Sequence, residues 1–441
     1  MNDKFWKELL DIMSNTIDTR LPNDIGKGHL PDNPAIKTPW EKLISLYDAM
    51  VFIARHRAGV GAVFYEVLRH YIPDYATRVT RCCDTADEFY IKMFAPEPEG
   101  RNFCKPTAVT MDVFPFMRGC FPTAMSGDNG DESLFMAGRV NDFGSFRFEK
   151  ELDTCPWDIL GTEICHTSPW AGTEKLGDSW KRFSRDRGPE LRVTMVEALG
   201  CGDPHCRMIG ENPDKFPMPP REKWDNFGPL AAPELVKYTP EEEKLDYRGL
   251  QMFREDCEFK YRTGTCAEYN AAGEGGGRGG YDVSSGSNLG CDYVTFALQD
   301  MIKKGEVTRE EVSALFELMF RGVGKMMFLD AYAVKGLRDW LGVPNDVNDG
   351  RVLGAYIEVY LQARKNQYDI VAFNKDDVIY DIDIKRFENG MAFMKDAYIP
   401  MWYGMSKTLI GSAWSLWEET EDVPEGKFRI KIAKKVDKFC L

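Results

Sequence analysis

Hydrophobic positions recur at helical spacing in the first third of the chain and at strand spacing beyond it. Apolar residues return every three or four positions over residues 40–71, which predicts a long amphipathic helix, and a second helix is predicted over 85–94. Apolar and polar residues alternate in 146–148 and in 191–196, the pattern of half-buried strands. A further helix is predicted between these strands, over about residues 173–183.

The second half of the chain repeats the order of elements found in the first. Four segments have later counterparts: residues 60–71 in 323–340 (with looser internal spacing), 146–149 in 378–384, 176–183 in 410–417 (with Trp180 matching Trp414), and 191–193 in 428–430. A preserved order of helices, strand, helix and strand favours a diverged tandem duplication over coincidence. The predicted fold is therefore α+β, with two diverged copies of a helices-on-antiparallel-sheet module that form a pseudo-dimer.

This duplication divides the chain into four parts. Residues 1–40 form an N-terminal helix and arm, 41–215 the first module, 216–299 a connector, and 300–441 the second module. The connector holds the glycine-rich stretch 273–280, which we interpret as a linker or lid. A phosphate-binding loop is disfavoured because no Gly-Lys-Ser/Thr follows it.

Composition and charge exclude several classes of protein. The net charge of −14 over 441 residues argues against a nucleic-acid-binding surface, which needs a basic footprint. No run of apolar residues is long enough for a membrane span, and the first residues lack the apolar stretch of a signal peptide. We expect a cytoplasmic protein, in which the 12 cysteines are thiols or metal ligands rather than disulfides.

Cysteine and histidine gather in one part of the first module, at Cys155, Cys165, His166, Cys201, His205 and Cys206. Thiolate and imidazole are preferred ligands of Zn²⁺, and four of them close a tetrahedral site. Gly202 and Pro204 predict a turn between Cys201 and Cys206, directly after a strand. The alternative is that these cysteines are buried free thiols. In the proposed alignment the second copy reaches this turn only at Cys440, so the cluster belongs to one copy, which favours a site-specific role.

The residues around this turn resemble a known family. Residues 196–210, Val-Glu-Ala-Leu-Gly-Cys-Gly-Asp-Pro-His-Cys-Arg-Met-Ile-Gly, look like the end of the vinyl-4-reductase-type domain. They are especially similar to the sensory domain of phenol- and xylene-responsive transcription activators. The segment from Cys165 to Gly177 resembles the cysteine-led helix of that domain, and Cys155-Pro156-Trp157 is similar to the related thiazoline-carboxylate hydrolases.

The resemblance implies a zinc ion held by cysteines and a glutamate, beside an apolar pocket for a small aromatic molecule. By position, Cys165 and Cys206 would be ligands, and Glu149 or Glu151 would supply the carboxylate. The chain departs from the family at Ala198, where a cysteine is usual, so Cys201 or Cys155 would replace that ligand. The activators' ATPase and DNA-binding domains have no counterpart in this sequence.

Three classes of function follow from this cluster. The first is an enzyme of hydrolase or lyase type acting on a small aromatic or heterocyclic molecule, with His166 or His205 as acid or base and a pocket lined by Phe146, Phe148, Trp157 and Trp170. The second is a non-catalytic binding or sensor protein with structural zinc, and the third is a metal-handling or thiol-redox protein. We expect neither nucleic acid nor membrane as a partner, and a homodimer stays open.

Overall fold

The computed structural model describes residues 35–85, 139–142, 147–152, 192–198, 202–204, 206–212, 294–363, 366–388 and 393–435. Described helices alternate with antiparallel strands, so the α+β class is confirmed.

The second half of the chain begins with a helix over residues 294–303. It continues through α12 (Arg309–Met327), α13 (Ala331–Leu341), α14 (Arg351–Ala363), β7 (Tyr368–Phe373), β8 (Asp377–Asp383), α15 (Ile384–Glu388), α16 (Met394–Leu409), β9 (Trp414–Glu419) and β10 (Lys427–Lys434).

Local signals fix the ends of two of these helices. Thr308 and Glu311 form a capping box at the start of α12, in which each side chain accepts the other residue's backbone N–H. Asp330 caps α13 by accepting the N–H of Tyr332, and Gly342 ends that helix in the left-handed region at φ 72°.

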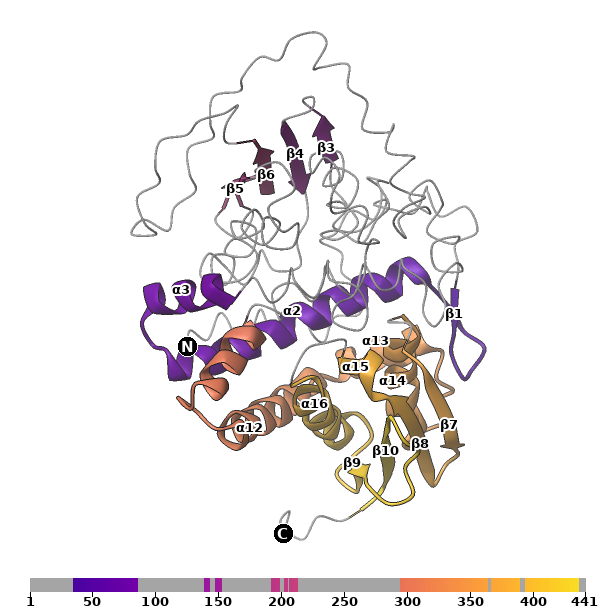
Figure 1. Ribbon diagram of the computed structural model, residues 1–441. Helices are drawn as coiled ribbons and strands as arrows, with labels where there is room; N and C mark the ends of the chain where they lie inside the picture. Colours follow the sequence, from indigo (N-terminus) through magenta and orange to yellow (C-terminus); the bar gives the residue numbers. More distant parts are fainter. Residues whose placement is uncertain are drawn as a thin grey trace.

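The second sheet has the strand order β7-β8-β10-β9, and every neighbouring pair is antiparallel. Phe428, Ile430 and Ile432 of β10 are buried, while Arg429 and Lys431 between them are partly exposed. This alternation gives the sheet one apolar face, on which α14 and α16 pack. The core of the second half lies between that face and these helices (Figure 1).

The first sheet consists of β3 (Arg139–Asp142), β4 (Arg147–Leu152), β5 (Arg192–Glu197) and β6 (Cys206–Glu211). Its order is β3-β4-β6-β5, again antiparallel throughout. In both sheets the strands therefore lie in the order first, second, fourth, third.

Helix α2 (Leu46–Tyr71) lies between the first sheet and the second half of the chain (Figure 1). Every residue from 59 to 68 is buried, so the helix is covered on all sides over this stretch. Its Phe64 ring meets Phe316 and Phe320 of α12, at centroid distances of 4.7 and 5.8 Å. After a break at residues 72–74, α3 (Tyr75–Thr85) follows.

The start of the predicted helix over 40–71 was wrong. Residues 35–45 form a hairpin of β1 (Ala35–Lys37) and β2 (Leu43–Ser45), and the helix begins only at Leu46. Burial of Ile36 and Ile44 against the second half stabilises this hairpin, and the Thr38 hydroxyl donates to the Leu341 carbonyl at 3.0 Å. The long-range partner makes these short strands favourable, which no local pattern shows.

The structure confirms some of the other predicted elements, corrects one, and leaves two outside the described residues. The strands predicted at 146–148, 191–196, 378–384 and 428–430 are confirmed as β4, β5, β8 and β10. The match of residues 410–417 with a helix was wrong, because Trp414 begins β9. By sheet position the third strand β5 corresponds to β9 rather than to β10. The predicted helices over 85–94 and 173–183 lie outside the described residues, except for Thr85, which ends α3.

None of the described helices combines the length and the apolar character that a membrane crossing requires.

Gly324 of α12 and Gly404 of α16 allow the backbones of these two helices to come into direct contact where they cross. A Cβ at Gly324 would overlap the carbonyl oxygen of Met401, and one at Gly404 would overlap that of Arg321. Each obstructing atom belongs to the backbone of the opposite helix, so no side-chain rotation relieves the overlap.

We predict that Gly324→Ala lowers the free energy of unfolding by about 3 kcal/mol, because the two helices must separate to admit the methyl group. Gly336→Ala is the matched control, since a Cβ there meets nothing within 4 Å and alanine favours the helix. Urea unfolding of both variants measures the difference. Equal stabilities would contradict the close crossing.

Candidate functional site

Most of the predicted site lies outside the described residues. This applies to Cys155, Cys165, His166, Cys201, His205, Phe146, Trp157 and Trp170. Phe148 and Glu149 lie on β4, and Cys206 is the first residue of β6; the structure describes these three by backbone position.

The turn predicted before Cys206 connects β5 to β6 as an antiparallel hairpin. The Ala198 N–H donates to Asp203 Oδ2 at 2.8 Å, and the Asp203 N–H donates to the Ala198 carbonyl at 3.2 Å. Gly202 has φ +95°, a conformation that favours glycine. The protein's own groups therefore close this turn. Asp203 was not singled out from the sequence, although Gly-Asp-Pro is a turn signal.

A β-bulge precedes the turn. Met195 pairs with Met208 and Glu197 pairs with Arg207, which leaves Val196 as the extra residue. Glu197 and Arg207 form an ion pair at 2.9 Å across the two strands. Bulges bend the strand that carries them and are common beside functional sites. Here the bulge and the ion pair set the direction in which the chain enters the turn.

The register of β4 on β6 separates two predicted metal ligands. Cys206 pairs with Leu152, whereas Glu149 pairs with Ile209, three positions further along the ladder. Since successive strand residues alternate between sheet faces, Cys206 and Glu149 belong to opposite faces. The same holds for Glu151, which pairs with Arg207. This register favours thiolate ligands over either carboxylate as companions of Cys206.

Within the described part of the chain, no group of three or more histidine, cysteine, aspartate or glutamate residues is placed to hold a metal ion. The predicted cluster itself falls largely beyond that part.

A buried carboxyl group lies in the second half, where the sequence offered no signal for it. Glu358 of α14 is 7% exposed. Its Oε1 accepts from the Tyr368 hydroxyl and from Gln362 Nε2, both at 3.2 Å, and its Oε2 accepts from the Tyr380 hydroxyl at 3.3 Å. Burial raises the pKa of Glu358, although these hydrogen bonds oppose the shift.

This glutamate cluster also contacts the N-terminal hairpin. Gln362 Nε2 donates to the Lys37 carbonyl of β1 at 3.4 Å, and Trp40 packs edge-on against Phe373 of β7. Gln362 bonds both the Glu358 carboxyl group and β1, so we assign the cluster a structural role in docking the hairpin.

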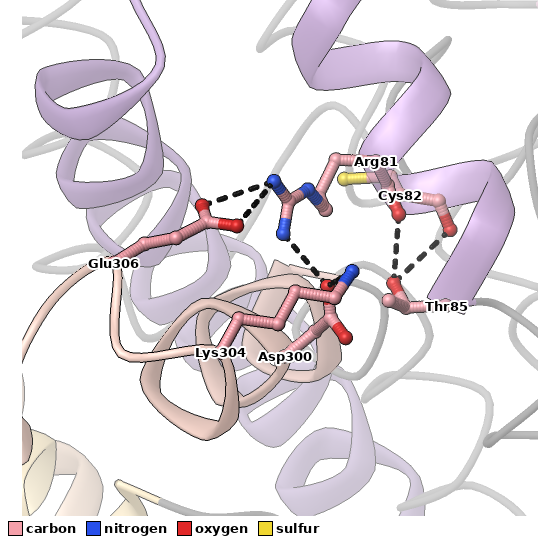
Figure 2. A network of polar contacts seen from close by, with 6 residues as sticks. All are labelled: Arg81, Cys82, Thr85, Asp300, Lys304 and Glu306. Carbon is pink, nitrogen blue, oxygen red and sulfur yellow. Dashed lines mark hydrogen bonds and ion pairs between the residues drawn. The ribbon is translucent and has the colours of Figure 1, made fainter.

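An ion-pair network joins α3 to the helix over residues 294–303 (Figure 2). Arg81 Nη1 donates to Asp300 Oδ2 at 2.7 Å, and Nη2 donates to both Glu306 oxygens at 3.0 Å. Lys304 adds a bond of 2.7 Å to Asp300. Burial opposes ionisation of Asp300, but the hydrogen bonds from Lys304 and Arg81 hold its pKa below the ordinary value.

Arg81 is more than 200 positions from Asp300 and Glu306 in the chain, so the network connects α3 to the second half. Beside it, the Thr85 hydroxyl caps the end of α3 by donating to the Arg81 carbonyl at 3.0 Å. Cys82 is buried and packs in the common core.

Comparison with protein-family models, with curated protein sequences and with solved structures found no significant match to this chain.

We predict that Glu358→Gln removes part of the pH dependence of folding. Because the pKa of Glu358 is higher in the folded protein than its ordinary 4.5, the folded state holds the proton more tightly. This contribution to stability is fully present below the unfolded pKa and is lost as pH rises through the folded pKa. The wild type should therefore lose stability relative to Glu358→Gln as pH rises above about 4.5.

Urea unfolding of both proteins between about pH 4 and pH 7 measures this difference. Glu310→Gln, at an exposed position in the first turn of α12, is the control and should follow the wild-type profile. Parallel curves for wild type and Glu358→Gln would contradict the burial argument.

Proposed function

We propose that this chain is a zinc–thiolate protein whose first half holds one metal site beside a pocket for a small aromatic or heterocyclic molecule. The observation that carries the proposal is that Cys155, Cys165, Cys201 and Cys206 lie in one stretch of sequence. The last of these cysteines follows the turn that the Ala198–Asp203 hydrogen bonds close. The resemblance to the vinyl-4-reductase-type domain rests on the same residues.

The described part of the hairpin suits a metal-binding turn. Two hydrogen bonds between Ala198 and Asp203 close the described part of the turn, and Cys206 follows at the start of β6. A turn that the protein's own hydrogen bonds close lowers the ordering cost of metal binding. Ala198 is fully buried, so the position at which the family usually has a cysteine is occupied by a small core residue.

Thiolates form the ligand set that we favour. The β4–β6 register assigns Glu149 and Glu151 to the face opposite Cys206, which removes support for a carboxylate ligand. Cys201 or Cys155 then completes the set with Cys165 and Cys206. We place the protein in the cytoplasm, where such thiols stay reduced.

We also propose that the two halves arose by duplication. The shared strand order supports this, as do the hairpin connections in corresponding places, residues 198–205 in the first sheet and 420–426 in the second. This pairing corrects the position expected for the second turn, which lies well before Cys440. The stretch 420–426 contains neither cysteine nor histidine, so the two turns differ in the residues that bind metal.

We favour an enzyme of hydrolase or lyase type for this site. Bound zinc supplies polarisation of a carbonyl-like group or a lowered pKa of bound water. His166 and His205 are each adjacent in sequence to a proposed ligand, where an imidazole can accept or donate the proton of the reaction. Phe146, Phe148, Trp157 and Trp170 are the proposed lining of the apolar pocket.

A non-catalytic binding or sensor protein is the second candidate. Removing Glu149 from the ligand set makes a four-thiolate site more favourable, and such a site leaves zinc no open position for substrate. Direct thiol-redox or metal-handling chemistry is the third, with no described contact that favours it.

We predict about one zinc per chain, and loss of that metal in Cys206→Ser together with a large loss of stability, because structural zinc is coupled to folding. Elemental analysis and thermal unfolding of anaerobically purified protein measure both. Cys257→Ser, outside the cluster, is the control and should keep its metal. Metal-free wild-type protein would exclude the proposed site.

We predict that His166→Ala weakens binding of the small molecule or lowers turnover about tenfold, as expected for one lost hydrogen bond in a pocket, while zinc content stays intact. A panel of small aromatic and heterocyclic compounds, followed by thermal shift and then by titration, supplies the probe. His70→Ala, at the exposed end of α2, is the control.

Loss of zinc from His166→Ala would instead make that residue a ligand. Unchanged binding, turnover and metal content would remove it from the site altogether.

A further inference from the structure

The outward face of α12 carries an apolar stripe. Leu318 is 71% exposed, Met326 46% and Leu329 70%, and Tyr332 at the start of α13 is 85% exposed. These four account for most of the large hydrophobic residues that lie exposed in the described part of the chain, the others being Leu43, Ile370 and Val371. Surface hydrophobic residues that gather in this way mark interaction sites, whereas single ones are ordinary.

The stripe follows the helical repeat. Leu318, Gly322 and Met326 are spaced by four residues, so they lie one above the other on a single face. The opposite face of α12 holds Phe316, Phe320 and Val323, which are buried against α2 and α16. At the centre of the stripe Gly322 has open space where a side chain would lie, which leaves room for a second helix to approach closely.

Charge order along the flank of this stripe identifies the occupant. Acidic Glu317 lies before Gly322, where it pairs with Arg321 of the same helix at 2.6 Å, and basic Lys325 lies after Gly322. If two such helices pair antiparallel about Gly322, Glu317 of each copy lies within one turn of Lys325 of the other. Leu318 of each then faces Met326 of the other. Parallel pairing would instead put like charges together.

The net charge around the stripe also permits two copies of the chain to associate. Residues 309–339 carry five basic and five acidic side chains and are neutral overall, in a chain of net charge −14. We propose that α12 and the start of α13 form a two-fold, antiparallel interface with a second copy of this chain, centred on Gly322. Such an interface is isologous, because the same surface serves both copies.

The test is the mass of the full-length protein in solution, measured by sedimentation velocity over a concentration series at about 50 mM salt. The wild type should be a dimer. Leu318→Lys should weaken dimerisation at least about 30-fold, since a two-fold interface loses the side chain twice. Ile370→Lys is the matched control; Ile370 is 50% exposed on β7, and β7 and α12 lie on opposite sides of the second half (Figure 1).

A charge exchange tests the antiparallel geometry. Glu317→Lys and Lys325→Glu should each weaken the dimer about threefold or more, and the double variant should recover wild-type association. Thermal unfolding of each variant verifies that the monomer fold is kept. A monomeric wild type, a Leu318→Lys protein that dimerises normally, or a double variant without recovery would each overturn the proposal.

Discussion

The burial of residues 59–68 of α2 on all sides is the constraint on which the rest of the described structure depends. A helix that is apolar all round has no solvent-facing side, so it is stable only when other elements cover it completely. Its Phe64 packs into the aromatic residues of α12, and α14 lies against it as well. The one acidic residue in the buried stretch, Glu66, lies 3.3 Å from the Arg69 guanidinium, which compensates its charge. Residues 36–82 and the second half of the chain are therefore joined through one core.

Polar contacts specify how the halves dock on that core. The Arg81 network, the Thr38 bond to Leu341 and the Gln362 bond to Lys37 each connect residues more than 200 positions apart. Hydrophobic burial supplies most of the stabilising free energy but has little directional preference. The buried Thr38 hydrogen bond adds that preference, because a shifted arrangement would leave its donor and acceptor without partners. The more exposed Arg81 and Gln362 contacts add a smaller preference through their geometry. The β1–β2 hairpin and α3 are held in this way at opposite ends of α2.

The two sheets combine one strand order with different chemistry at their hairpins. In the first sheet the Glu197–Arg207 ion pair and the Asp203 turn lead to Cys206, whereas the corresponding turn of the second sheet has no thiol. Under the proposed duplication, the framework is common to both copies and the metal chemistry belongs to one. A pseudo-symmetric framework of this kind allows one turn to change without disturbing the other, because each hairpin is closed by its own local contacts.

The sequence by itself determined the elements whose signal is local. Alternation predicted β4 and β5, since period two is a property of the strand alone, and helical periodicity predicted the body of α2. The match of later segments to these two strands predicted β8 and β10. The thiols and imidazoles of the proposed metal site are likewise known from sequence, because ligand chemistry is read from residue type. Only the tertiary structure decided the β1–β2 hairpin, the assignment of Trp414 to a strand, and the separation of Glu149 from Cys206 by register. The same holds for the Glu358 cluster and the Arg81 network. Each of these depends on which distant segments come together, and that is set by the packing of the core rather than by any local pattern.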